Sequence, residues 1–253
     1  METSVKFRPV IHVYTLCYNE QLILPFFLSH YLSFCDHVTI FDNYSDDNSR
    51  KIAESFGSRV SIRQFDSDNT FNDQLHLEVK NECWKEARGA ADYVIVCDMD
   101  EFLYTKDWGK LFNQMLSNNY TIATPRGFDM VAEARPQNGK QIYEQITQGV
   151  RATYLDKTVL FRPEAIDDIN YGAGAHACNP QGNVVWRPDD GGLKLLHYRY
   201  FGLPDLLKKY NCYRERLSEV NRQHGWGCHY GLSQEKQTIL WEELLAGRKE
   251  VLE

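Results

Sequence analysis

The sequence predicts an α/β protein with a mostly parallel central sheet and flanking helices. Short apolar or β-branched runs alternate with amphipathic segments from residue 10 to residue 97, a pattern typical of parallel strands joined by helices. The run Tyr-Val-Ile-Val-Cys over 93–97 is apolar throughout, as expected of a strand that is buried on both faces. It stops abruptly at Asp98, Asp100 and Glu101.

The first part of the chain supplies the repeating strand and helix segments. Asn19 can cap a helix that follows the first strand, and Gly57 and Gly89 can end the next two helices. Strands are expected over 10–16, 37–41, 60–65 and 93–97, and helices over 20–34, 51–56 and 72–88.

The second part of the chain is less regular. Asp107 and Ser233 can cap two further helices, whereas segment 129–148 shows no clear period. Strands are expected over 120–124, 158–161 and 193–200, and helices over 107–117, 204–220 and 234–252. The sequence contains no repeat and no low-complexity linker, which favours a single domain over 1–253.

Composition excludes several classes of function. Of the 253 residues, 43% are hydrophobic and 25% are charged, and the formal net charge is −7 with no basic cluster. Nucleic acid is therefore not expected as the main partner. The seven cysteines form no Cys-x-x-Cys pair, which favours reduced thiols over a zinc site. No segment is apolar and long enough to span a membrane, so we expect a cytoplasmic protein, and a peripheral position at a membrane stays open.

The end of the 93–97 strand is the first candidate site. Ligands of open α/β sheets bind outside the carboxyl ends of the strands. Asp98 and Asp100 are two residues apart and share one side if the backbone stays extended. Two such carboxylates repel each other unless a cation lies between them, and a divalent metal there could hold a nucleotide diphosphate. The alternative is that the acidic residues simply end a strand in solvent.

Five sequence pieces in order resemble the GT-A fold glycosyltransferases, with the closest likeness to family 2-like enzymes and to the family 92 type. They lie at 15–20, 40–47, 74–83, 97–102 and 196–200, and the likeness extends from residue 10 to about residue 209. The resemblance implies a Rossmann-like GT-A fold, with a nucleotide-sugar-binding half over about 10–105 and an acceptor-binding half over about 106–253. It also implies a metal-dependent, inverting transfer of a sugar from a nucleotide-sugar donor to a glycan, a lipid-linked acceptor or another hydroxyl group.

The resemblance assigns the metal ligands. Asp98 and Asp100 match the Asp-x-Asp motif that holds Mn²⁺ (or Mg²⁺), which stabilises the departing nucleoside diphosphate. His197 matches a third ligand, and an imidazole favours manganese over magnesium. The alternative for His197 is a histidine packed in the core. Glu101 completes the motif, where a role beside the metal and a structural role are equally open.

Two loops match the nucleotide contacts of such enzymes. Tyr18 and Glu20 lie in the first loop, where an aromatic ring can lie against the base. Asp42 and Asn43 lie in the second, where a carboxylate can accept a hydrogen bond from the base or the ribose. Ordinary turn chemistry is the alternative for these residues.

Further residues are assigned to the donor and the acceptor. Gln74 and Asn81 lie seven apart on one helix face, which the resemblance turns toward the donor; the alternative is an amide pair that bonds loop backbone. Met99 is grouped with the nucleotide contacts, and Lys157 and His176 with the donor phosphate or the acceptor.

An inverting transfer needs a general base. Asp129 is the first candidate because it follows the first strand after the metal motif, and Glu133, Asp167 and Asp168 stay open. Two other classes also stay open: a metal-dependent phosphohydrolase and a non-catalytic nucleotide- or carbohydrate-binding module. Glu101 and Phe102 count against the phosphohydrolase, which favours Thr or Val at that point.

Overall fold

The computed structural model describes residues 8–252, apart from the side chain of Tyr200. Its described strands form a six-stranded sheet in the order β3-β2-β1-β4-β9-β6, a five-stranded sheet in the order β13-β8-β7-β12-β5, and the pair β10-β11. The strands are β1 (Ile11–Cys17), β2 (His37–Asp42), β3 (Val60–Gln64), β4 (Tyr93–Val96), β5 (Glu101–Tyr104), β6 (Ile122–Ala123), β7 (Arg126–Ala132), β8 (Gln148–Arg151), β9 (Leu160–Phe161), β10 (Ile166–Asp168), β11 (Gln181–Gly182), β12 (Lys194–Phe201) and β13 (Lys249–Glu250).

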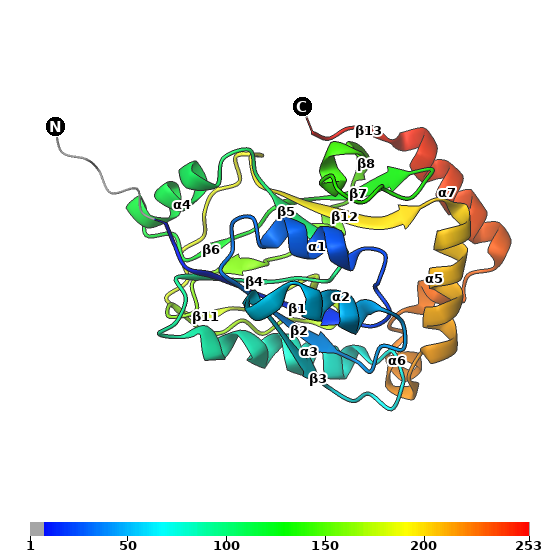
Figure 1. Ribbon diagram of the computed structural model, residues 1–253, viewed down its shortest axis with the longest axis horizontal. Helices are drawn as coiled ribbons and strands as arrows, with labels where there is room; N and C mark the ends of the chain where they lie inside the picture. The colour runs from blue at the N-terminus through cyan, green and yellow to red at the C-terminus, as the bar shows by residue number, and fades with distance from the viewer. Residues whose placement is uncertain (1–7, 253) are drawn as a thin grey trace.

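The larger sheet confirms the predicted fold class. Strand β1 pairs in parallel with β2 and β4, and β2 pairs in parallel with β3. Strands β9 and β6 extend this sheet with antiparallel pairings. Parallel neighbours need crossover helices, and Figure 1 shows α1 and α2 packed over one face of these strands. The helices are α1 (Leu24–Tyr31), α2 (Ser49–Ser55), α3 (Asp73–Glu82), α4 (Trp108–Ser117), α5 (Leu203–Arg216), α6 (Glu219–His224) and α7 (Gln234–Gly247).

The central strands are buried on both faces, as their composition predicts. Val13 and Ile95 belong to the apolar cluster that includes Phe27 of α1. Their neighbours Tyr14 and Val94 point the other way, into a second cluster that contains Trp84. Successive side chains of a strand face opposite sides, so each strand contributes to two cores.

Several helices differ from their predicted bounds; the helix expected over 234–252, for example, ends at Gly247, and strand β13 follows it. The helix expected over 20–34 begins at Leu24 because residues 21–23 form turns. The helix expected over 204–220 ends at Arg216, because Ser218 is extended and its side chain accepts a hydrogen bond from the Asn221 amide. That cap begins α6, and α5 and α7 then lie beside each other at one end of the molecule (right in Figure 1).

The smaller sheet aligns the acidic motif with the later half of the chain. Strand β12 lies between β5 and β7, so His197 is opposite Glu101 on one side and Asp129 on the other. Neither β5 nor β7 was predicted, since β5 begins within the acidic motif, at Glu101, and β7 begins before the irregular segment. This sheet brings residues distant in sequence to one place.

Helix α1 is tied to β5 by two buried side chains. The Tyr31 hydroxyl donates to the Glu101 carbonyl and accepts from the Leu103 amide, both at 2.9 Å. His30 Nε2 donates to the Leu103 carbonyl at 2.8 Å. No described group bonds His30 Nδ1, which is buried. The imidazole is therefore held neutral, because a proton on Nδ1 would have no acceptor.

This histidine should make stability depend on pH. Burial lowers the pKa of His30 from 6.5 to about 4. Between these two pH values the unfolded chain therefore binds a proton at this imidazole and the folded chain does not. Stability present above pH 6.5 is lost as pH falls toward 4, by about 2 kcal/mol at pH 5. His30→Gln has no imidazole to titrate. Between pH 7.5 and 5, denaturant unfolding should show that its free energy of unfolding falls by about 2 kcal/mol less than that of the wild type. Equal losses would contradict this assignment.

Within residues 8–252, the structure contains no helix with the length and apolar character needed to cross a bilayer.

Candidate active site

A cavity of about 910 Å³ lies at the carboxyl ends of β1 and β4 and reaches the helices of the C-terminal part. Its walls come from both sheets and from α3, α5 and α7. Most of the predicted site residues line it, namely Tyr18, Glu20, Asn43, Asp98, Met99, Asp100, Asp129, Lys157, His176 and His197.

Three predicted site residues, Asp42, Gln74 and Asn81, are not among the described residues that line this cavity. The Asp42 carboxylate accepts hydrogen bonds from the Ser45 amide and hydroxyl. This is the ordinary turn chemistry that the sequence left open as the alternative for Asp42. Gln74 Nε2 donates to Glu78 at 3.3 Å, and the Asn81 side chain accepts from the Tyr171 amide at 2.7 Å.

Helix α3 presents a different face from the predicted one. Asp73, His76, Leu77 and Lys80 line the cavity, and their spacing is that of one helical face. Each residue turns an α-helix by about 100°. A face chosen one residue later, at Gln74 and Asn81, therefore points away from the cavity.

The acidic motif turns instead of continuing the strand. The Glu101 amide donates to the Asp98 carbonyl at 3.0 Å, and the Glu101 carboxylate accepts from the Asp98 amide at 3.0 Å. Asp98 and Asp100 therefore do not share one side, as an extended backbone would require. The turn directs the two carboxylates to different cations.

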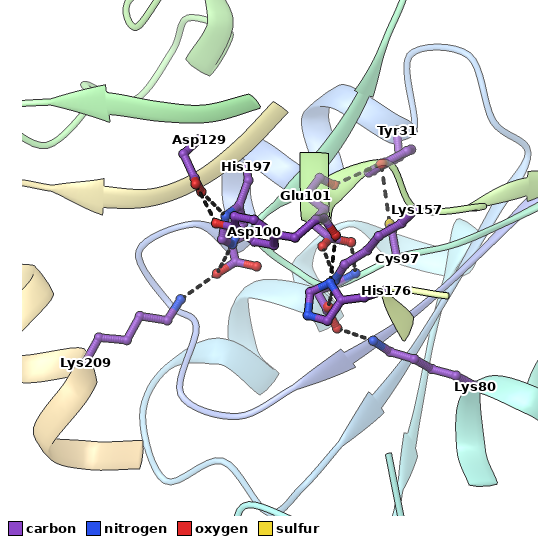
Figure 2. A network of polar contacts seen from close by, with 12 residues as sticks. Tyr31, Lys80, Cys97, Asp100, Glu101, Asp129, Lys157, His176, His197 and Lys209 are labelled. Atoms are coloured by element: carbon purple, nitrogen blue, oxygen red, sulfur yellow. Dashed lines mark hydrogen bonds and ion pairs between the residues drawn. The ribbon is translucent and has the colours of Figure 1, made fainter. Parts of the chain in front are cut away.

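Asp98 is bound by two lysines. Its oxygens lie 2.6 Å from Lys80 Nζ and 3.1 Å from Lys157 Nζ. Burial alone would raise the pKa of Asp98, but these two ammonium groups hold it below its usual range. Lys157 also contacts the Glu101 carboxylate at 2.6 Å, as Figure 2 shows. This part of the site is a network of opposite charges.

Asp100 is bound by Lys209 and faces His197. Lys209 Nζ lies 2.7 Å from Asp100 Oδ2, and His197 Nε2 lies 3.5 Å from the same oxygen. His197 Nδ1 lies 2.7 Å from Asp129 Oδ1, and the Tyr154 hydroxyl donates to the other Asp129 oxygen. Figure 2 shows Asp100, His197 and Asp129 in a row. Burial opposes protonation of His197, but the two carboxylates raise its pKa to about 9.

Removing the Lys157 charge should destabilise the fold. The Lys157 and Glu101 side chains are 5% and 2% exposed. Lys157→Met would leave Glu101 as a buried carboxylate without its ammonium, a change that costs about 3–5 kcal/mol. Urea unfolding would measure the loss. The double variant Lys157→Met/Glu101→Gln should recover much of it, and a single-variant loss below about 1 kcal/mol would contradict the role of this pair.

Two facing side chains, Asp100 and His197, could hold a divalent metal. Within the described residues, no group of three or more His, Cys, Asp or Glu side chains is placed to hold a metal ion. Asp100 and His197 nevertheless face each other, and Asp129 binds the other ring nitrogen of His197. Metal-bound histidines commonly have such a carboxylate partner, and nucleotide-bound metals often have only one or two protein ligands.

An aromatic ring and a guanidinium in contact with each other, those of Tyr18 and Arg216, also line the cavity. The Arg216 guanidinium carbon lies 3.1 Å from the centre of the Tyr18 ring, and Arg216 Nε donates to the Asn69 carbonyl at 3.1 Å. Asn43, from the end of β2, donates to the Ser67 hydroxyl at 2.8 Å. The first predicted nucleotide loop thus meets the C-terminal end of α5 through Tyr18 and Arg216.

Three site residues were missed at the sequence level. Lys80 could have been found from the spacing of the α3 face described above. Lys209 and Tyr154 carry no local signal, because Lys209 is one of several charged residues on α5 and Tyr154 lies in a short 3₁₀ turn. Only the tertiary structure brings them to the acidic motif.

Solved structures offer distant likenesses. TarS from S. aureus, crystallised as residues 1–349 in complex with UDP-GlcNAc, has 10% identity and a TM-score of 0.43, with 87% of this chain and 71% of that chain covered. A longer TarS structure has 11% identity and a TM-score of 0.44, with coverage of 92% and 43%. Glucosyl-3-phosphoglycerate synthase from Mycobacterium tuberculosis, in complex with Mn²⁺, UDP and glucosyl-3-phosphoglycerate, has 16% identity and a TM-score of 0.29, with coverage of 48% and 44%.

The family comparison is more decisive. The sequence matches no curated protein, whereas residues 13–166, more than half of the chain, match the model of glycosyl transferase family 2. That segment begins in β1 and contains the acidic motif and Asp129, and its parallel sheet is of the expected GT-A type. The resemblance to family 92 remains a prediction. The chain belongs to glycosyl transferase family 2.

Proposed function

We propose that this protein transfers a sugar from a nucleotide-sugar donor to a hydroxyl group of an acceptor, with a divalent metal held by Asp100 and His197. The arrangement of Asp100, His197 and Asp129 carries the proposal. Asp100 Oδ2 lies 3.5 Å from His197 Nε2, and Asp129 Oδ1 lies 2.7 Å from His197 Nδ1. Mn²⁺ (or Mg²⁺), when bound, would neutralise charge on the donor diphosphate.

The two predicted aspartates receive different roles in this proposal. Both oxygens of Asp98 contact lysine ammonium groups, so we assign Asp98 to orienting Lys80 and Lys157 instead of ligating the metal directly. These lysines line the cavity and offer positive charge for a leaving diphosphate. Tyr18, Asn43 and Met99 would contact the nucleotide.

Asp129 is the proposed general base of an inverting transfer. It lines the cavity with Tyr154, and its side chain is 8% exposed. The hydrogen bonds from Tyr154 and His197 use one site on each oxygen, and a carboxylate has about four such sites. Asp129 can therefore also accept a hydrogen bond from an acceptor hydroxyl, and His176, whose ring bonds the Tyr154 carbonyl, would lie beside that acceptor.

The test uses purified protein with Mn²⁺ and a panel of UDP-, GDP- and dTDP-sugars. We expect one donor to be consumed, by transfer or slow hydrolysis, and EDTA to stop the reaction. Phosphate release from monoesters would favour the phosphohydrolase class instead. Binding of nucleotide without turnover for any donor and acceptor would favour a binding module.

A further inference from the structure

Lys209 places a protein cation on the carboxylate that we assign to the metal. Its ammonium lies 2.7 Å from Asp100 Oδ2 and 3.3 Å from Glu20 Oε1. The side chain is 20% exposed and reaches the site from α5, outside the segment that matches the family model. Figure 2 shows it approaching Asp100 from the side away from Lys157.

In its position, Lys209 competes with a divalent metal ion for the Asp100 carboxylate. A divalent ion bound to Asp100 would share this carboxylate with an ammonium group a few ångströms away, and like charges at such distances repel strongly in a partly buried site. Its two carboxylate partners, Asp100 and Glu20, favour the charged ammonium form of Lys209.

A nucleoside diphosphate changes this balance, because its negative charges can lie between two cations and attract both. Glu20 gives Lys209 a second carboxylate partner, so the ammonium can stay in the site when Asp100 turns to a metal. Lys209 would then weaken the binding of the metal alone and strengthen the binding of the metal together with the diphosphate.

We propose that Lys209 couples metal binding to nucleotide binding, by occupying Asp100 until a divalent cation and a nucleoside diphosphate arrive together. The inference rests on the proposed metal site at Asp100 and His197. Coupling of this kind is reciprocal, so the factor by which nucleotide tightens metal binding equals the factor by which metal tightens nucleotide binding.

The test measures free Mn²⁺ by its electron paramagnetic resonance signal, with and without UDP or GDP. Lys209→Met should tighten the binding of Mn²⁺ alone by about tenfold or more and reduce the tightening caused by nucleotide by a similar factor. Lys209→Arg, which keeps the charge, should behave like the wild type. Lys208→Met is the matched control, because it removes the same charge from an exposed position one residue away.

Three outcomes decide the matter. Tighter binding of Mn²⁺ alone in Lys209→Met, but not in Lys208→Met, supports the inference. Equal Mn²⁺ affinities in all variants, with the wild type still binding Mn²⁺ in the presence of nucleotide, overturn the inference and leave the proposed function standing. A wild type that binds no Mn²⁺ even with nucleotide overturns both.

A second variant guards against misfolding. Lys209→Met leaves Glu20 and Asp100 without their shared cation, which can destabilise the fold. Glu20→Gln/Lys209→Met removes the ion pair as a whole and leaves Asp100 beside His197. It should show the same gain in affinity for Mn²⁺ alone, and failure to do so in a folded protein would again count against the coupling.

Discussion

Asp100→Asn should weaken the Mn²⁺-dependent binding of a nucleoside diphosphate by roughly a hundredfold, or about 2.7 kcal/mol. The amide has nearly the shape of the carboxylate but no net charge to attract a divalent ion. It also leaves Lys209 without one of its two carboxylates, which adds a positive charge beside the metal. Calorimetric titration of UDP or GDP, with Mn²⁺ and then with EDTA, measures the effect.

Two control variants separate the metal from the rest of the site. Asp98→Asn should change nucleotide affinity by a similar factor with and without Mn²⁺, because Asp98 contacts Lys80 and Lys157. His197→Ala should reduce the free energy of metal binding by more than it reduces the free energy of unfolding. A collapse of stability in His197→Ala would favour the core-histidine alternative, and an unchanged Mn²⁺ dependence in Asp100→Asn would remove Asp100 from the metal site.

The parallel half of the fold was predictable because its signals are local. The apolar run 93–97 is buried on both faces, as its composition requires, and Asp107 caps α4 by accepting from the Lys110 amide. The smaller sheet was not predictable in the same way. Strand β5 has four residues and begins in the acidic motif, so only its pairing with β12 identifies it as a strand.

The candidate site was likewise predictable only in part. Strand ends of the parallel sheet were expected to meet, and they bring Tyr18, Asn43 and Asp98 to one cavity. The charge pairs could not be read from the sequence, because they join residues such as Asp100 and Lys209 that are far apart in the chain. The turn at the acidic motif was missed for another reason: it depends on a bond between the Glu101 amide and the Asp98 carbonyl.

Asp129→Asn should lower the rate of sugar transfer by about 10²–10⁴-fold, since an amide cannot accept the proton of the acceptor hydroxyl. Asp129 also binds His197 Nδ1, so its loss can act through the metal as well, typically by 10–100-fold in metal affinity. The two effects separate in a single-turnover measurement with saturating donor. If Asp129 acts only by orienting His197, high Mn²⁺ concentrations should restore the rate.

A general base predicts a different result: the rate of Asp129→Asn stays low at every Mn²⁺ concentration. Tyr154→Phe is the matched comparison, because it removes the hydrogen bond to the same carboxylate and keeps the proton acceptor. It should cost about 10- to 100-fold at most, the scale of one hydrogen bond to a charged group, and less than Asp129→Asn does. Equal losses in Asp129→Asn and Tyr154→Phe would mean that the Tyr154–Asp129 contact orients the site and that the base lies elsewhere, with Glu133, Asp167 and Asp168 as the next candidates.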